Sequence, residues 1–173
     1  AYNDSFRQTD TRQKFSFSAF YNFDSSNANN ATLQLFHGWQ QIAHNNRQGW
    51  IIYVEKRNGT SARIRIQYQN NLFITTDYFD TTFDDWHRVV MTSHDGVMKI
   101  YHDDTEVYSN NNMYLLPGRP SRNTYYIGAG NAKGSVDHVA IYQGGLYTPD
   151  EVANNSVYDP AAAPAQPANY HSA

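Results

Sequence analysis

The sequence contains no cysteine among its 173 residues. Disulfide bonds, thiolate metal sites and cysteine nucleophiles are therefore excluded. Charged residues make up only 17% of the chain and the net charge is −3. The strongly basic face that duplex DNA requires is absent, so we expect no nucleic-acid partner. No apolar run approaches the roughly 18 residues that a membrane span needs, so we expect none.

Short alternating runs separated by turn signals dominate what is present. In residues 62–69, apolar side chains fall on one face and arginine and glutamine side chains on the other. Asn58-Gly59 and Asp95-Gly96 are strong hairpin signals, because these residue types tolerate positive φ. The pattern predicts an all-β protein with an antiparallel two-sheet sandwich.

One apolar run, residues 134–142, does not keep the period of two. Val136, Val139 and Ile141 cannot share a face of a regular strand, because a step of three separates the first two. A β-bulge near Asp137-His138 restores the phase and turns the Asp137 carboxylate out of the sheet.

The C-terminal part is expected to be organised differently. Thr148, Pro149 and Glu151 match the N-cap, N1 and N3 positions of a capping box and predict one short helix over residues 148–155. The Pro/Ala-rich residues 158–173 predict an extended tail or linker. We therefore expect a domain over residues 1–157 and a tail that lies against it or against neighbouring copies. The start at Ala1 suggests a processed protein or an excised domain.

Four segments resemble laminin-G-like, concanavalin A-like jelly-roll domains, in the family's order. They are Gly-Ser-Val-Asp-His-Val-Ala-Ile-Tyr at residues 134–142, Trp-His-Arg-Val-Val-Met-Thr-Ser-His-Asp-Gly at residues 86–96, the following strand at residues 97–101, and Tyr-Tyr-Ile-Gly at residues 125–128. The resemblance covers about residues 14–152. It departs at Arg88, where the family has histidine, and at Asp103-Asp104, where it has Asp-Gly.

The resemblance implies a jelly-roll sandwich that binds a ligand, and a Ca²⁺ ion held by Asp137. Its partner oxygens would come from residues 3–6 or from the loop that begins at Asp24, since calcium prefers carboxylate and carbonyl oxygens. The alternative is that Asp137 only accepts a hydrogen bond from a backbone amide at the bulge.

The expected ligand face follows from the expected core. If the alternating apolar residues fill the space between the sheets, their neighbours face outward and, should the strands be adjacent in one sheet, form a shallow polar surface. Guanidinium groups there could bind an acidic glycan through paired hydrogen bonds. The alternative is an ordinary solvated face. The core set is Ile64, Ile66, Val89, Met91, Met98 and Ile100, and the ligand-binding set is Arg63, Arg65, Gln67, Arg88, Lys99 and Tyr101.

Catalysis and zinc binding are not predicted. Jelly-roll glycosidases need two carboxylates on one strand, and the only glutamates, Glu55, Glu106 and Glu151, fall on separate segments. No lyase-type Gln-Ile-His triplet occurs. The histidines lack metal-binding spacing tied to a carboxylate, and His102 and His138 stand alone in the sequence.

We therefore expect a non-catalytic recognition or adhesion module, binding a glycan or surface polysaccharide, of a secreted, cell-surface or virion-surface protein. Two alternatives stay open. One is a structural subunit of a capsid decoration, fibre or filament, and the other is a polysaccharide-active enzyme with an unrecognised site.

Overall fold

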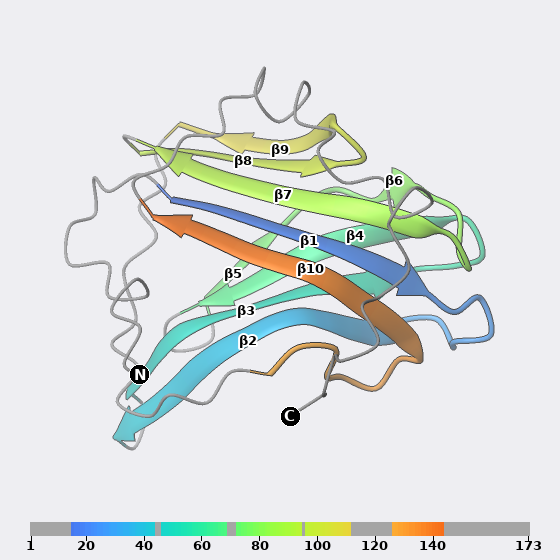
Figure 1. The fold of residues 1–173 in the computed structure, drawn as a ribbon, viewed down its shortest axis with the longest axis horizontal. Coiled ribbons are helices and arrows are strands. Elements are labelled where there is room, and N and C mark those ends of the chain that lie inside the picture. Colours follow the sequence, from blue (N-terminus) through green and yellow to red (C-terminus); the bar gives the residue numbers. More distant parts are fainter. Residues whose placement is uncertain (1–14, 44–45, 69–71, 95, 112–125, 144–173) are drawn as a thin grey trace, which may run out of the picture.

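The structure is a computed structural model and describes residues 15–43, 46–68, 72–94, 96–111 and 126–143. These residues form two antiparallel sheets that face each other (Figure 1). The predicted all-β, two-sheet jelly-roll architecture is confirmed. The expected helix at 148–155 and the tail at 158–173 lie outside the described residues. Within the described part, no helix is long and apolar enough to cross a membrane.

The first sheet has the order β10-β1-β7-β8-β9 and the second has the order β2-β3-β4-β5, with the short β6 also pairing with β4. The first is built from β10 (Gly134–Gln143), β1 (Phe15–Phe23), β7 (Trp86–His94), β8 (Val97–His102) and β9 (Thr105–Asn110). The second is built from β2 (Thr32–Ala43), β3 (Asn46–Lys56), β4 (Ser61–Tyr68), β5 (Leu72–Thr75) and β6 (Phe79–Asp80).

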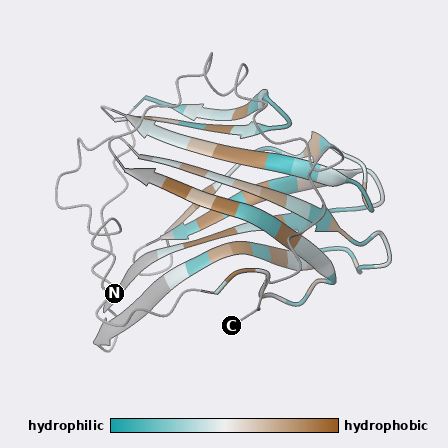
Figure 2. Cartoon of the chain, viewed as in Figure 1, coloured by the Kyte–Doolittle hydropathy of each residue, from teal (hydrophilic) through white to brown (hydrophobic). Residues whose placement is uncertain are grey.

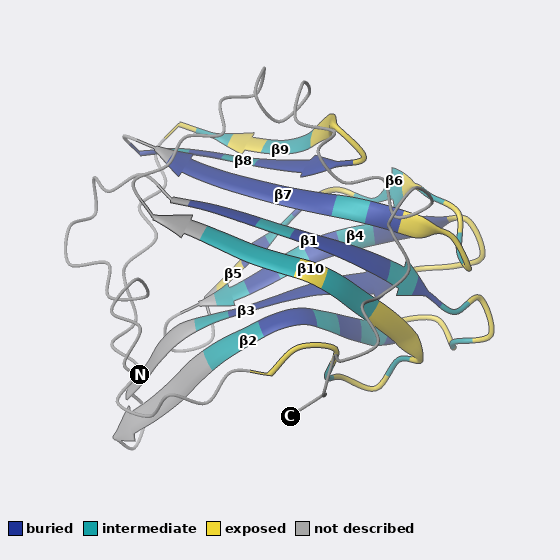
Figure 3. Cartoon of the chain, in the orientation of Figure 1, coloured by how far each residue is buried: buried dark blue, intermediate teal, exposed yellow. Residues whose placement is uncertain are grey.

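The hydrophobic core lies between the two sheets. Apolar and polar residues alternate along strands such as β2 and β10 (Figure 2), and the core-facing strands β1, β7 and β8 are mostly buried (Figure 3). Complete burial of one such aliphatic side chain contributes about 1.5–3 kcal/mol. All the predicted core residues are 0% exposed, which confirms that prediction: Ile64, Ile66, Val89, Met91, Met98 and Ile100.

Strand β10 contains the expected bulge. Its register with β1 shifts between Ser18 and Phe20, so that His138 and Val139 together face the single residue Ala19. His138 takes up the extra residue with a φ of 45°. Val139 and its apolar neighbours in the strand then pack against the core, while Asp137 pairs with Phe20 on the outer side. The predicted outward turn of Asp137 is confirmed.

The β8–β9 hairpin is closed by Asp103 and Asp104, whose φ angles are 46° and 65°. Positive φ at both central residues is the geometry of a type I′ turn, and aspartate tolerates it better than most residues. The turn brings the Asp103 carboxylate back to β7, where Oδ1 accepts a hydrogen bond from the Arg88 amide at 2.8 Å. The Asp-Asp pair therefore forms a tight turn and delivers a carboxylate to the sheet.

Candidate functional site

The expected ligand-binding residues do not form one surface. Arg63, Arg65 and Gln67 lie on β4, whereas Arg88, Lys99 and Tyr101 lie on β7 and β8 of the other sheet. The outward faces of two stacked sheets point away from each other, so the single six-residue face expected from the sequence is wrong. β7 and β8 are neighbours, but β4 is not adjacent to either of them, as that expectation required.

The members of this set on β7 and β8 are buried or interact with neighbouring side chains of the same sheet. Tyr101 is only 4% exposed and packs with Val90. The Lys99 ammonium lies 2.7 Å from a Glu106 carboxylate oxygen. The Arg88 guanidinium lies 3.8 Å from Asp104. In this half, the Tyr101 ring is thus too buried to contact a ligand.

The half on β4 is organised around a buried carboxylate. Glu55 of β3 lies directly opposite Arg63 in the sheet and is 4% exposed. Its Oε1 accepts hydrogen bonds from Arg63 Nη2 at 2.5 Å and Nε at 3.0 Å, and its Oε2 accepts one from Arg65 Nη1 at 2.6 Å. One carboxylate thus holds two guanidinium groups side by side on the outer face.

Aromatic rings flank these guanidinium groups. Arg63 lies over the Tyr78 ring, 4.8 Å from its centre, and Arg65 lies 4.7 Å from the centre of Phe73 and 5.6 Å from that of Tyr53. Phe73 is 43% exposed. We call this surface the guanidinium–aromatic platform, and it comprises Tyr53, Glu55, Arg57, Arg63, Arg65, Gln67, Phe73 and Tyr78.

The platform also carries neutral hydrogen-bonding groups. The Tyr53 hydroxyl donates to Gln67 Oε1 at 3.2 Å. Burial raises the pKa of Tyr53, and the neighbouring Arg65 charge offsets only part of this increase, so the hydroxyl stays protonated. Rings, an amide and forked cationic donors are therefore combined on one sheet face, a mixture that suits stacking on a ligand and hydrogen bonding to its oxygen atoms.

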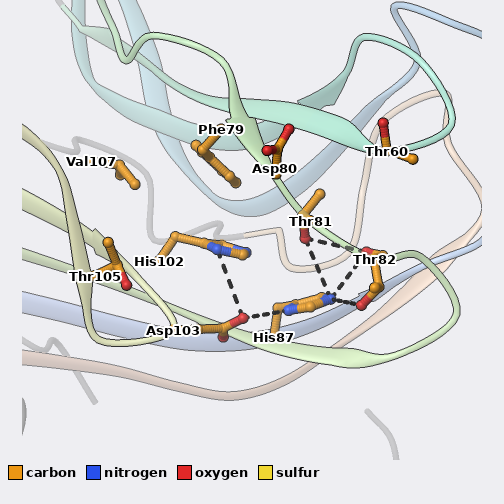
Figure 4. A pocket seen from close by; sticks show the side chains of 10 residues that line it. All are labelled: Thr60, Phe79, Asp80, Thr81, Thr82, His87, His102, Asp103, Thr105 and Val107. Atoms are coloured by element: carbon orange, nitrogen blue, oxygen red, sulfur yellow. Dashed lines mark hydrogen bonds and ion pairs between the residues drawn. The ribbon is translucent and has the colours of Figure 1, made fainter.

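A second candidate site is a hollow of about 610 Å³ beside β6 and the β8–β9 hairpin (Figure 4). Most of its polar groups are threonine hydroxyls, carboxylates and two imidazoles. We call it the histidine hollow, and its lining comprises Thr60, Phe79, Asp80, Thr81, Thr82, His87, His102, Asp103, Thr105 and Val107.

His87 is held at both ring nitrogens. Its Nδ1 lies 2.5 Å from Asp103 Oδ2, and its Nε2 lies 3.0 Å from the Thr82 carbonyl oxygen. Burial by itself would lower the pKa of His87, but the hydrogen bond and charge of Asp103 and the Thr82 carbonyl raise it above its usual value. A carbonyl only accepts, so Nε2 carries a proton and cannot serve as a base toward the Thr82 hydroxyl 3.1 Å away. The arrangement is therefore not that of an activated threonine nucleophile.

His102 lies beside His87 in the same wall. Its Nε2 is 2.9 Å from the Tyr21 hydroxyl and its Nδ1 is 3.7 Å from Asp103 Oδ2. Its ring stacks on Phe79, with 4.4 Å between ring centres. Burial lowers the pKa of His102 to about 4, so the ring is neutral at physiological pH.

The interpretation of His102 as an isolated histidine, drawn from sequence spacing, does not predict this cluster. That interpretation is wrong, because the β7–β8 hairpin pairs Val89 with His102 and thus brings His87 and His102 to the same face. The Asp95-Gly96 turn was a usable signal. Counting back from it along both strands would have placed these two histidines near each other.

Asp137 makes the hydrogen bond to a backbone amide that was expected as the alternative to calcium binding. Its Oδ1 accepts a hydrogen bond from the His138 amide at 2.7 Å and lies 2.9 Å from His138 Nδ1. In the loop after Asp24, the carbonyl oxygens of Ser25 and Asn27 accept hydrogen bonds from Lys56 Nζ at 2.5 and 2.8 Å. An ammonium group already occupies these oxygens, so they do not fit as calcium ligands. Residues 3–6 lie outside the described part, and calcium at Asp137 stays a prediction.

Comparison with known proteins identifies the fold. The family model described as the concanavalin A-like lectin/glucanases superfamily matches residues 2–153. No curated protein matches the chain.

Solved structures with the same fold come from several kinds of protein. The binding domain of botulinum neurotoxin DC in complex with SialylT has a TM-score of 0.56 and 14% identity, over 85% of this chain and 36% of that one. A mutant of Trypanosoma rangeli sialidase displaying trans-sialidase activity has a TM-score of 0.55 and 17% identity, over 82% of this chain and 22% of that one. The native heptameric SAP-like pentraxin from Limulus polyphemus has a TM-score of 0.54 and 13% identity, over 82% of this chain and 68% of that one. The chain thus spans well under half of the first two proteins, and at these identities the likeness concerns the fold.

Proposed function

Since the chain belongs to the concanavalin A-like lectin/glucanases superfamily, we propose that it is a non-catalytic glycan-binding module whose ligand lies on the guanidinium–aromatic platform. The similar structures include a sialidase and the binding domain of a toxin in complex with SialylT. These two structures support a carbohydrate as the ligand class. A secreted, cell-surface or virion-surface parent protein belongs to the same proposal.

The observation that carries the proposal is the pairing of Arg63 and Arg65 by Glu55 beside exposed ring surface. The side chains of the two arginines remain 27% and 26% exposed. Because ion pairing and ring contacts already restrict these side chains, the arginines would lose little conformational entropy when a ligand binds. Phe73, at 43% exposure, offers a face for a sugar ring.

The charge of the platform favours an acidic glycan. Arg57, which lies 4.5 Å from the centre of the Tyr78 ring, adds a third guanidinium group. Three guanidinium groups and the single Glu55 carboxylate leave two positive charges uncompensated among these four residues. Carboxylate or sulfate groups are bound by guanidinium through charge-assisted hydrogen bonds. Contacts of one module with single sugar groups are individually weak, so several copies would bind a polyvalent surface by avidity.

A glycan array with neutral and acidic ligands, read with and without calcium, tests this function. We expect binding to acidic glycans by the wild type and a loss of about tenfold or more in R65Q and F73A, since each removes one of the aligned groups. K99Q is the matched control, because it also removes one cation from an outer sheet face. Wild-type protein that binds no glycan, or binding lost in K99Q and kept in R65Q, would contradict the proposal. A stable oligomer that binds no glycan would favour the structural-subunit alternative.

A further inference from the structure

The geometry of the histidine hollow points to a second binding site, and we propose that His87, His102 and Asp103 bind a transition-metal dication of the Zn²⁺ type. This inference does not depend on glycan binding by the platform, because the two sites share no residue. The three side chains come from the β7–β8 hairpin and the β8–β9 turn rather than from one sequence motif.

The first observation is convergence of the donor atoms. The nitrogen and oxygen atoms that the three side chains offer lie within 4.8 Å of one another. Nδ1 of His87 and Nδ1 of His102 both face the same atom, Asp103 Oδ2, at 2.5 and 3.7 Å (Figure 4). Ligand atoms bound tetrahedrally at zinc distances are about 3.3 Å apart. The two separations from Asp103 Oδ2 bracket this value, and the limit of 4.8 Å on all separations exceeds it by about 1.5 Å, so the two imidazoles would move slightly toward each other around an ion.

The second observation concerns the opposite ring nitrogens. His87 Nε2 donates to the Thr82 carbonyl at 3.0 Å, and His102 Nε2 lies 2.9 Å from the hydroxyl of Tyr21, which is 1% exposed. A metal-bound histidine usually donates its other N–H to an acceptor, which sets the ring orientation and leaves the ligating nitrogen unprotonated. Both outer partners are in place here. A His87–Asp103 ion pair by itself does not involve His102 and so gives no reason for the Tyr21 contact.

The third observation is the orientation of the carboxylate. Asp103 Oδ1 accepts from the Arg88 amide at 2.8 Å, and the turn residue itself has a φ of 46°. These constraints leave Oδ2 directed toward the two imidazoles (Figure 4). The ligand positions are therefore held by the backbone of β7 and of the β8–β9 turn.

The donor set indicates which ions would bind. Two imidazole nitrogens and one carboxylate oxygen suit Zn²⁺, Co²⁺, Ni²⁺ or Cu²⁺, whereas Ca²⁺ and Mg²⁺ prefer oxygen ligands throughout. Three protein ligands leave at least one position of a tetrahedral ion available to water or to a ligand hydroxyl. Because the three residues line the hollow, that position would be accessible from it.

Cobalt absorption spectroscopy on the protein without a histidine tag tests the site, with the fold of each variant checked by circular dichroism. We expect saturable visible absorption from bound Co²⁺ that Zn²⁺ removes and Ca²⁺ does not. H102Q, in which an amide can still bond to Tyr21, should weaken Co²⁺ binding about tenfold or more, and D103N likewise. H138Q is the matched control, because His138 also lies 2.9 Å from an aspartate, Asp137, but both side chains are nearly half exposed.

The inference is overturned if the wild type gives no saturable cobalt spectrum, or if H138Q loses the spectrum and H102Q keeps it. Should H102Q fail to fold, NMR of the wild-type imidazoles decides. Zn²⁺ should then shift the ring signals of His87 and His102 before those of the other five of the seven histidines. A uniform shift of exposed histidines would count against the site.

Discussion

Lys56 at the end of β3 holds the loop after Asp24 through its ammonium group. It is 4% exposed, donates to the carbonyl oxygens of Ser25 and Asn27 at 2.5 and 2.8 Å, and lies 4.8 Å from the centre of the Phe83 ring. K56M should lower the free energy of unfolding by about 2–4 kcal/mol, because it leaves both carbonyl groups without their charged partner. Urea denaturation measures this. K99M, which removes a partly exposed pair with Glu106, should cost less than about 1 kcal/mol. Equal losses in the two variants would show that the buried hydrogen bonds of Lys56 contribute no more to stability than the exposed ion pair of Lys99.

His102 gives the protein a pH-dependent stability. Burial lowers its pKa from 6.5 to about 4, so the folded state favours the neutral ring. Its contribution is complete above pH 6.5 and declines as pH falls from 6.5 to 4, by up to about 3 kcal/mol. For His87 the sign is opposite. Burial would lower its pKa, but Asp103 raises it, so its contribution is present below pH 6.5 and is lost as pH rises through the raised value.

We therefore expect H102Q to remove much of the acid-induced loss of stability between pH 6.5 and 4.5. Burial would raise the pKa of Asp103, but the His87 hydrogen bond lowers it below the ordinary aspartate value, so this neighbouring carboxylate titrates below the range. Urea denaturation at several pH values, with EDTA present, provides the comparison. Parallel pH profiles for wild type and variant would contradict this role of His102.

The bulge in β10 leads us to expect that glycine is more stable than alanine at position 138, the reverse of an ordinary strand position. His138 has a φ of 45°, a conformation in which a Cβ atom costs about 1–2 kcal/mol and glycine has no such cost. H138G should therefore be more stable than H138A by about 1 kcal/mol, although both lose the same imidazole. At an ordinary strand position glycine is the less stable of the two by about 0.5–1 kcal/mol. Thermal or urea unfolding of the two variants gives the sign directly, and a more stable H138A would contradict the bulge geometry.

The turn between β8 and β9 shows how an element can create a site. Asp103 and Asp104 close the hairpin with positive φ angles, and this conformation, together with the Arg88 amide, aims a carboxylate at both imidazoles. The identity of the turn residues was visible in the sequence. Their effect on the histidine hollow follows only from the register of β7 with β8.

For the molecule as a whole, stability depends on the apolar layer between the sheets. Ile66 is 0% exposed and Ile127 is 54% exposed, which makes them a matched pair. I66A should reduce the free energy of unfolding by about 2–5 kcal/mol, because it removes buried surface and leaves a cavity. I127A should change it by less than about 0.5 kcal/mol. Chemical denaturation of both variants measures the difference, and similar losses would show that the core is not concentrated between the sheets.

Local sequence patterns specify the layered β architecture, the inward residues of β4, β7 and β8, and the bulge that turns Asp137 outward. These features depend on local alternation, on turn residues and on a break in the period of two, all of which are short-range properties of the chain. The sequence also contains the Asp95-Gly96 turn signal between the two strands that carry His87 and His102, and the register of that hairpin brings the two histidines together.

Which strands share a sheet depends on how the complete chain packs and could not be predicted from local patterns. Alternation specifies which residues share one face of a strand but not which strand lies next to it, because strand order depends on the connections and on packing of the complete core. Arg65 and Lys99 were thus placed on one surface by pattern and lie on opposite layers in the fold. For the same reason, the contact of Lys56 with the loop after Asp24 and that of Tyr21 with His102 join residues 29 to 81 positions apart, a separation that no local pattern reports.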